Sequence, residues 1–143
     1  VISVLNGNET LGDSEISQAL QKHLHCAGVD SRLLEYRGPR QVLEQVGEVD
    51  LFLSMRLHGA IAAYLLDKPF VMIEYHRKCA DFLDYIGLDG RLRMPNQRVD
   101  EETVVSCLEH ALRVKARCKF LPEKYAANAK RIYADSPWGP SSR

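Results

Sequence analysis

Short apolar runs alternate with amphipathic segments along the chain, and this alternation predicts strands followed by helices. The apolar runs end at turn-forming residues, as buried strands commonly do. The amphipathic segments repeat apolar residues at the spacing of one helix face. The predicted strands are residues 1–5, 31–36, 49–53, 70–73 and 92–94, and the predicted helices are residues 14–27, 39–46, 59–66, 78–86, 101–116 and 122–134.

Residues at the ends of the predicted helices support these boundaries. Asp13 or Ser14 can cap the first helix and Asp100 the fifth, while Gly28 and Gly87 stand where helices commonly stop. Strands separated by helices favour a parallel sheet covered by helices on both faces, because parallel strands need long, right-handed crossovers. We therefore predict an α/β fold.

The predicted fold forms one domain over residues 1–136, followed by a flexible tail over residues 137–143. A chain of 143 residues is long enough to bury one core. The tail contains two Pro and one Gly, which do not favour a packed terminal element. The chain has no internal repeat and no low-complexity segment.

The balance of charged residues argues against nucleic acids and anionic membranes as partners. The 19 basic and 19 acidic residues give a formal net charge of zero, whereas proteins that bind nucleic acid or anionic membranes usually carry an excess of base. No apolar run approaches the roughly 18 residues of a membrane span, and the chain opens on a predicted strand instead of a leader. We therefore predict a cytoplasmic protein with no nucleic-acid partner and no transmembrane segment, which reaches the inner face of the membrane only through partners.

The four cysteines argue against a metal site. Cys26, Cys79, Cys107 and Cys118 are widely spaced and form no Cys-x-x-Cys pair. Zinc and iron–sulfur sites are built from close pairs of thiolates. We expect reduced, mostly buried thiols and no metal ion.

The segment from Asp50 to Ala60 carries the most distinctive chemistry. A predicted strand ends near Ser54, and Arg56 and His58 then precede an apolar helix. In α/β proteins ligands bind outside the carboxyl ends of the strands, and helix N-termini attract anions. Two cationic or titratable side chains at this point predict an anion-binding site.

The same region resembles the polysaccharide pyruvyl transferase family over residues 49–88. The residues that carry the shared pattern are Asp50, Met55-Arg56-Leu57-His58, Pro69-Phe70, Tyr75 and Lys78. Members of that family look like two-domain enzymes of the glycosyltransferase-B type. The resemblance implies that this chain is the C-terminal, donor-binding half, with a Rossmann-like parallel sheet flanked by helices.

The resemblance also implies a reaction. Family members transfer the pyruvyl group of phosphoenolpyruvate to a sugar diol of a surface polysaccharide or of its lipid-linked precursor, which forms a cyclic ketal. The implied partners are phosphoenolpyruvate, the sugar or lipid-linked glycan acceptor, and an N-terminal domain or a second copy of the chain. No metal or organic cofactor is expected.

Two departures from the family pattern bear on this expectation. The family's N-terminal half has no counterpart here, so the chain is a fragment, needs a partner, or is not catalytic alone. Where family members often have Ser-Tyr-Asp-Pro-Lys, this chain has Glu74-Tyr75-His76-Arg77-Lys78. The lysine is kept, the acidic residue is lost, and two potentially cationic residues are gained.

Arg56 and His58 are the predicted catalytic residues. The planar guanidinium of Arg56 offers paired donors to a carboxylate or a phosphate. His58 can exchange protons near neutral pH or stabilise the departing phosphate, and the sequence does not separate these two roles. Leu57 is expected to pack beneath the site, and Tyr75 and Lys78 complete the predicted substrate-binding set.

Other polar and aromatic residues are secondary candidates. His76 and Arg77 are further candidates for ligand contact, and Glu74 is expected to pair with Arg56 or Arg77. The residues for which we expect ordinary structural roles are His23, His25, His110, the turn Asn6-Gly7-Asn8, and the terminal aromatics Tyr125, Tyr133 and Trp138.

Two rival functions stay open. A glycosyltransferase of the same architecture would bind a nucleotide sugar, but many of those carry two Glu residues eight positions apart, and Glu74 is followed at that spacing by Phe82. A non-catalytic domain would use the fold for protein association, through apolar surface on residues 121–138. Nucleotide-sugar binding would favour the first, and a dimer in solution would favour the second.

Overall fold

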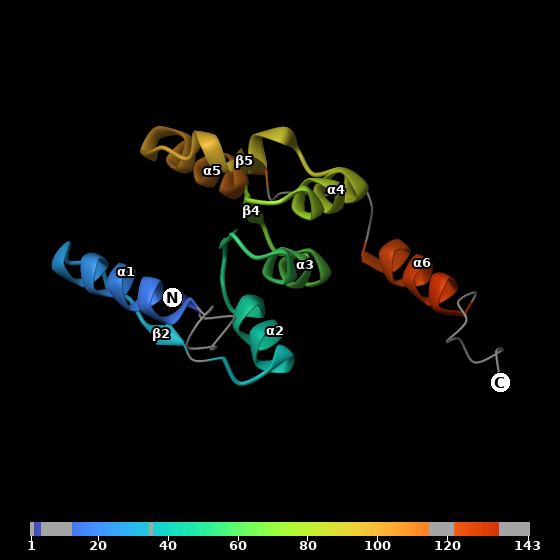
Figure 1. The fold of residues 1–143 in the computed structure, drawn as a ribbon, viewed down its shortest axis with the longest axis horizontal. Coiled ribbons are helices and arrows are strands. Elements are labelled where there is room, and N and C mark those ends of the chain that lie inside the picture. The colour runs from blue at the N-terminus through green and yellow to red at the C-terminus, as the bar shows by residue number, and fades with distance from the viewer. Residues whose placement is uncertain (1, 4–12, 35, 115–121, 135–143) are drawn as a thin grey trace. The chain divides into compact units, whose positions relative to one another are not determined.

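Two sets of parallel strands and helices make up the protein. In a computed structural model of the chain, the described residues are 2–3, 13–34, 36–114 and 122–134. The chain divides into two compact units, residues 1–48 and 49–143, which we describe separately (Figure 1). The predicted α/β class is confirmed. A single domain over residues 1–136 stays a prediction, and the expected tail over residues 137–143 lies outside the described residues.

The first unit pairs two short strands. Strand β1 (Ile2–Ser3) lies parallel to β2 (Leu33–Leu34). Helix α1 (Ser14–Cys26) connects the strands and contacts both of them, as a crossover between parallel strands does. Helix α2 (Pro39–Gly47) begins at its proline, whose fixed φ angle suits the first helical position.

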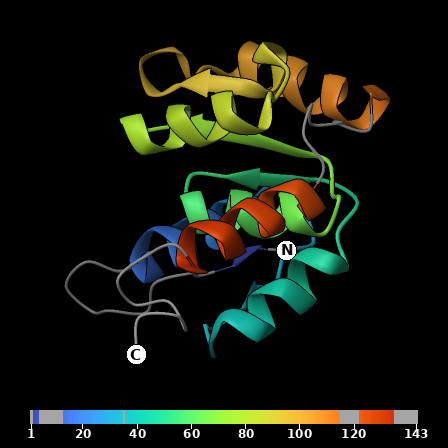
Figure 2. The ribbon, with the colours of Figure 1, turned by 90° about the vertical axis from the view of Figure 1, so that its right-hand side faces the viewer.

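The described residues of the second unit form three strands and the remaining helices. In chain order its elements are β3 (Phe52–Ser54), α3 (Leu57–Leu65), β4 (Phe70–Glu74), α4 (Arg77–Ile86), the 3₁₀ turn η1 (Gly90–Leu92), β5 (Arg93–Pro95), the 3₁₀ turn η2 (Asn96–Arg98), α5 (Glu101–Val114) and α6 (Pro122–Ala134). Helix α3 contacts β3 and β4, while α5 contacts β4, β5 and η1. Figure 2 shows β5 running beside α5, drawn in orange.

Strand β4 is the centre of a parallel sheet with the order β3–β4–β5. Ser54 of β3 and Arg93 of β5 both lie opposite Met72 of β4. Residues 70–73 of β4 are all buried. Because successive side chains of a strand point to opposite faces, both faces of β4 are covered.

Most predicted elements of the second unit lie near their expected places, with shifts at the ends. Strand β3 begins at Phe52 instead of residue 49, and α3 begins at Leu57 instead of residue 59. The earlier start of α3 places His58 in its first turn. The predicted Asp100 cap of α5 is confirmed, because Asp100 Oδ1 accepts a hydrogen bond from the Thr103 N–H at 2.8 Å.

Helices α1, α3 and α4 end in the same kind of hydrogen-bonded turn, which uses one residue in the left-handed conformation. After α1 and α4 this residue is the predicted glycine, Gly28 at φ 75° and Gly87 at φ 66°. After α3 it is Asp67 at φ 52°, and the Lys68 N–H donates to the Ala63 carbonyl at 2.9 Å. A side chain beyond Cα makes this conformation costly, so the end of α3 is strained where the other two ends are not.

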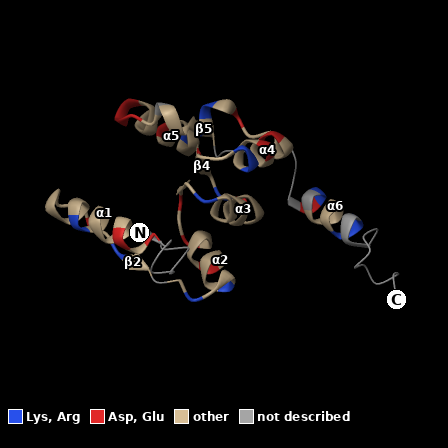
Figure 3. Ribbon diagram, in the orientation of Figure 1, with Lys and Arg blue, Asp and Glu red and all other residues tan. Residues whose placement is uncertain are grey.

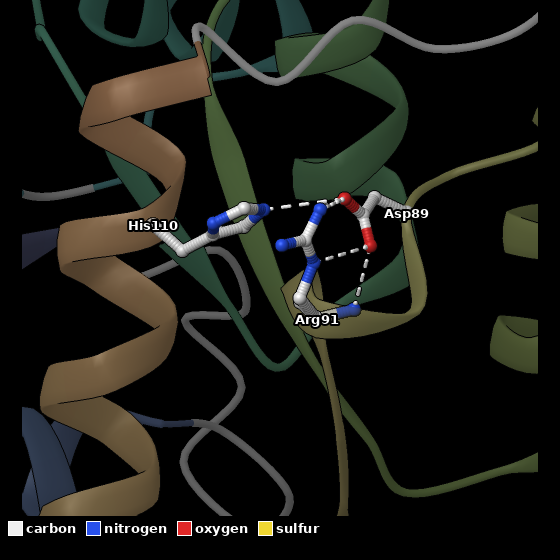
Figure 4. Close-up of polar contacts among 3 residues, drawn as sticks. All are labelled: Asp89, Arg91 and His110. Atoms are coloured by element: carbon white, nitrogen blue, oxygen red, sulfur yellow. Dashed lines mark hydrogen bonds and ion pairs between the residues drawn. The ribbon is translucent and has the colours of Figure 1, made fainter.

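A charged cluster joins α5 to the turn before β5 (Figure 4). Asp89 Oδ2 accepts a hydrogen bond from Arg91 Nη2 at 2.8 Å and lies 3.2 Å from His110 Nε2. Hydrogen bonds from the side chain and backbone of Arg91, and then from His110, hold the pKa of Asp89 well below its usual range. His110, for which an ordinary structural role was expected, is buried on α5 and lies beside this carboxylate.

Helix α6 is bonded to α4 through one polar pair. Asn128 Nδ2 donates a hydrogen bond to the Tyr85 hydroxyl at 2.7 Å. The anchoring roles predicted for Tyr125, Tyr133 and Trp138 fall on side chains outside the described part of the chain.

The strain at the end of α3 predicts a stabilising substitution. Asp67→Gly should raise the free energy of unfolding by about 0.5–1 kcal/mol, because glycine adopts the left-handed conformation without a steric penalty. Thermal or urea denaturation measures the change. Asp67→Ala is the control, since it keeps the penalty and should give no gain. A Gly variant less stable than the wild type would contradict the prediction.

The Asp89 cluster predicts a specific loss of stability in acid. Because the pKa of Asp89 is lower in the folded than in the unfolded chain, its ionised form stabilises the fold above about pH 4, and that contribution is lost as the pH falls further. Asp89→Asn should therefore be less stable at pH 7 and lose less stability on acidification than the wild type. Urea denaturation from pH 7 to pH 3 tests this, and equal pH slopes for both proteins would refute it.

Candidate functional site

The carboxyl ends of β3 and β4 meet at one edge of the sheet, and the predicted site residues follow directly from them. Strand β3 ends at Ser54 and leads to Arg56, and β4 ends at Glu74 and leads to Tyr75. The two strands are parallel neighbours, so both connections lie at the edge where ligands of α/β proteins commonly bind. The fold thus brings both halves of the predicted site to one edge.

Ser54 fixes the turn from β3 into α3. Its hydroxyl donates a hydrogen bond to the Arg56 carbonyl oxygen at 2.7 Å and accepts one from the Arg56 N–H at 3.2 Å. Ser54 is buried, so these bonds are shielded from water. They hold the backbone of Arg56 in the extended conformation that precedes the helix.

Gly59 allows α3 to approach this turn closely. A Cβ atom at this position would lie 2.8 Å from Ser54 Oγ and 3.1 Å from the nearest ring carbon of Phe52. Both distances are shorter than comfortable van der Waals contacts. Gly59 is therefore needed for space between helix and strand, and its own backbone is ordinary helix.

Basic side chains stand at the N-terminus of α3, which is the positive end of the helix dipole. Arg56 caps the helix and is half-buried, Leu57 is half-buried, and the side chain of His58 is exposed. The first turn contains no acidic residue. Unpaired N–H groups and the helix dipole already favour an anion here, so the side chains and the backbone favour the same kind of ligand.

Helix α4 begins in a similar way. His76 caps it, and its Nδ1 accepts a hydrogen bond from the Lys78 N–H at 3.2 Å. Lys78 is the second residue of α4, as His58 is of α3, and its Nζ lies 5.7 Å from the ring centre of the exposed Tyr75. The first turn of α4 also has no acidic residue. Figure 3 shows the start of α4 in blue and the start of α5 in red.

Glu74 pairs with Arg93, whereas the sequence suggested Arg56 or Arg77. The two carboxylate oxygens of Glu74 accept hydrogen bonds from Arg93 Nε at 2.8 Å and from Arg93 Nη2 at 3.0 Å. Arg77 Nε lies 3.8 Å from Asp81 Oδ1, and both side chains are exposed on α4. The negative charge of Glu74 at this edge of the sheet is therefore balanced by Arg93.

Three residues that shape this edge were missed as functional candidates: Ser54, Gly59 and Arg93. Ser54 left a signal in the sequence, because a small polar residue ends an apolar run. Gly59 also left one, since a glycine inside a helix often marks a close approach. Arg93 left none, because its partners lie 9 and 19 positions earlier in the chain.

The described residues show neither a metal cluster nor a membrane span. No group of three or more His, Cys, Asp or Glu side chains in them could hold a metal ion, and none of their helices is long and apolar enough to cross a membrane. Cys79 and Cys107 are buried and Cys26 is exposed, all as free thiols. Burial raises the pKa of the Cys107 thiol, which keeps it protonated and unreactive.

The segment that contains β3 and the start of α3 belongs to a longer stretch of family similarity. Residues 10–77 match the family model of the polysaccharide pyruvyl transferases. The pyruvyl transferase resemblance inferred from the sequence is thereby confirmed over these residues, and the match supports a role in polysaccharide pyruvylation in general. The match includes Arg56, Leu57, His58 and Tyr75 and ends one residue before Lys78. No curated protein and no solved structure matches the chain.

The close approach at Gly59 predicts that alanine destabilises the packing of α3 against β3, although alanine normally favours helices. Overpacking of about 1–3 kcal/mol should outweigh the intrinsic helical gain of about 1 kcal/mol. Chemical denaturation of Gly59→Ala should therefore show a net loss. Gly90→Ala is the matched control, because a Cβ there meets nothing within 4 Å.

A double substitution tests the cause of the loss at Gly59. If Ser54 Oγ is the obstacle, Gly59→Ala should cost less in a Ser54→Ala background than in the wild type. Equal costs in the two backgrounds would show that Ser54 is not responsible. A stabilised Gly59→Ala protein would refute the close packing itself.

Proposed function

We propose that this chain binds phosphoenolpyruvate at the carboxyl edge of β3 and β4 and acts as the donor-binding half of a polysaccharide pyruvyl transferase. The observation that carries the proposal is the pair of basic helix starts at this edge, within or beside the segment that matches the family. The first turns of α1, α5 and α6 contain acidic residues, whereas those of α3 and α4 contain none and carry His58, Arg77 and Lys78. Helix α2 also starts without an acidic residue, but it lies in the first unit.

The proposed ligand has the charges that suit this edge. Phosphoenolpyruvate carries a carboxylate and a phosphate on a three-carbon frame, and two helix N-termini offer two positive ends. Arg56 has the planar fork that binds either group through two hydrogen bonds. Lys78 supplies a compact positive charge that suits phosphate, and Tyr75 supports it through a cation–π contact.

The proposed reaction joins two sugar hydroxyls to one carbon of the donor. Protonation of the methylene carbon makes a methyl group and leaves C2 electrophilic, and one hydroxyl oxygen then bonds to C2 and loses its proton. The second hydroxyl oxygen bonds to C2 as the C2–O bond to phosphate breaks, and phosphate leaves with the remaining charge. The two hydroxyl protons balance the proton taken up by the methylene carbon and the one released to solvent or phosphate.

Two side chains would carry this chemistry. His58 is exposed at the start of α3, where an imidazole can move protons or support the departing phosphate. Arg56 would hold the carboxylate or the phosphate while charge develops on the phosphate oxygens. We assign no metal or organic cofactor to the reaction.

The acceptor and the remaining half of the site would come from elsewhere. We propose that the acceptor is a sugar diol of a surface polysaccharide or its lipid-linked precursor, met in the cytoplasm or at the inner face of the membrane. An N-terminal domain or a second copy of the chain would complete the site, in the two-domain arrangement of glycosyltransferase-B-type enzymes. The small parallel sheet with flanking helices is compatible with that arrangement.

Calorimetric titration of phosphoenolpyruvate into the chain tests the donor site. The wild type should show saturable binding, and Arg56→Ala should weaken it at least about tenfold, since a charged, two-pronged hydrogen bond is worth about 1.5–3 kcal/mol. Arg40→Ala is the matched control. Arg40 is exposed and pairs with Glu44 on α2, so its loss changes the net charge equally and should leave the affinity unchanged.

The outcomes separate the rival functions. A wild type that binds no phosphoenolpyruvate overturns the proposed donor site, and binding that survives in Arg56→Ala overturns the role of Arg56. A nucleotide sugar is titrated in parallel. If it binds and phosphoenolpyruvate does not, the chain belongs to the glycosyltransferase alternative.

A further inference from the structure

Arg93 connects three elements of the second unit through one guanidinium group. It is the first residue of β5 and bonds Glu74, the last residue of β4, at 2.8 and 3.0 Å. Its Nη1 also donates to Asp84 Oδ1 on α4. The side chains of Arg93 and Glu74 are only 20% and 14% exposed, whereas that of Asp84 is 67% exposed.

The pair between Arg93 and Glu74 is well suited to fixing geometry. Two parallel hydrogen bonds between planar groups define an orientation as well as a distance. Limited access of water reduces screening of the two charges. The hydrogen bonds that Arg93 donates to Glu74 chiefly raise the pKa of Arg93, and the one that it donates to Asp84 adds to the effect.

The two partners of Arg93 bracket the connection that carries half of the proposed site. Glu74 stands immediately before Tyr75, and Asp84 stands on α4 beyond Lys78. One guanidinium thus ties the end of the strand before the connection to the helix after it. Between these points the His76 cap and the Tyr75–Lys78 contact are exposed, and exposed contacts of this kind are individually weak.

We propose that Arg93 is a positioning residue of the phosphoenolpyruvate site, which sets where α4 begins relative to β4 and thereby where Lys78 and Tyr75 stand. This inference rests on the proposed function. Arg93 itself is placed outside the binding set, because it already donates to both oxygens of Glu74 and to Asp84.

Arg93→Lys is the decisive variant, because it keeps the positive charge and loses the two-pronged geometry. The first readout needs no ligand. The amides of Lys78 and Cys79 donate to His76 within the first turn of α4, so their hydrogen exchange reports opening of that turn. We expect exchange at these amides to rise about tenfold in Arg93→Lys.

The second readout is the affinity for phosphoenolpyruvate, measured at a temperature where all variants are folded. A displaced Lys78 should lower the affinity by about ten- to a hundredfold. Glu74→Gln should give the same direction with a smaller effect, because the amide keeps the shape and loses the charge. Asp89→Asn is the matched control, since it breaks the other charged cluster on the segment before β5 and should change neither readout beyond its effect on overall stability.

These readouts distinguish failure of the inference from failure of the proposed function. Wild-type affinity in Arg93→Lys, or unchanged exchange at the amides of Lys78 and Cys79, overturns the role of Arg93 and leaves the donor site standing. Equal effects of Asp89→Asn, at equal loss of stability, overturn it as well. Absence of phosphoenolpyruvate binding in the wild type overturns the donor site, and with it the assignment of Arg93.

Discussion

The arrangement of the second unit depends on the burial of β4 between two parallel neighbours. A parallel strand can be completed only by covering both of its faces, and residues 70–73 are covered in this way. Parallel pairing sends the carboxyl ends of the strands to one edge, so the connections after β3 and β4 must emerge together. The juxtaposition of Arg56, His58, Tyr75 and Lys78 at that edge is a consequence of strand direction and does not require contact among them.

The short segment from Asp89 to Arg93 holds the neighbouring elements in place. Asp89 binds His110 of α5, and Arg93 binds both Glu74 of β4 and Asp84 of α4. Two charged clusters therefore link this segment to α5, to β4 and to α4. Each cluster is partly shielded from water, which strengthens its interactions relative to those of exposed ion pairs.

Local sequence patterns predicted most helices and strands, whereas contacts between residues far apart in the sequence were not predicted. The apolar run of β4, the helix stops at Gly28 and Gly87, and the Asp100 cap depend on neighbours in the sequence, which the pattern contains. The Arg56–His58 motif was also visible, because a strand, a turn and a helix follow one another without a break.

The contacts that support the motif were not predictable in the same way. Glu74 was expected to pair with Arg56 or Arg77, yet it bonds Arg93, because the parallel pairing of β4 with β5 brings Arg93 close to Glu74. His110 was expected to be ordinary for a similar reason, since its carboxylate partner lies 21 positions earlier. The observed boundary between β3 and α3 differs from the predicted one by a few residues. The Ser54 hydroxyl forms the turn between them through hydrogen bonds, and apolar periodicity carries no information about such bonds.

The identical placement of His58 and Lys78, each as the second residue of its helix, makes the length of the strand-to-helix connections as constraining as their chemistry. One residue inserted before either cap would lengthen the connection by up to about 3.5 Å and so displace the basic group from the sheet edge while leaving every amino acid of the motif present. A single insertion that conserves all recognisable residues would therefore disrupt the geometry of the proposed site, and the spacing between strand and cap is as informative as the identity of the residues.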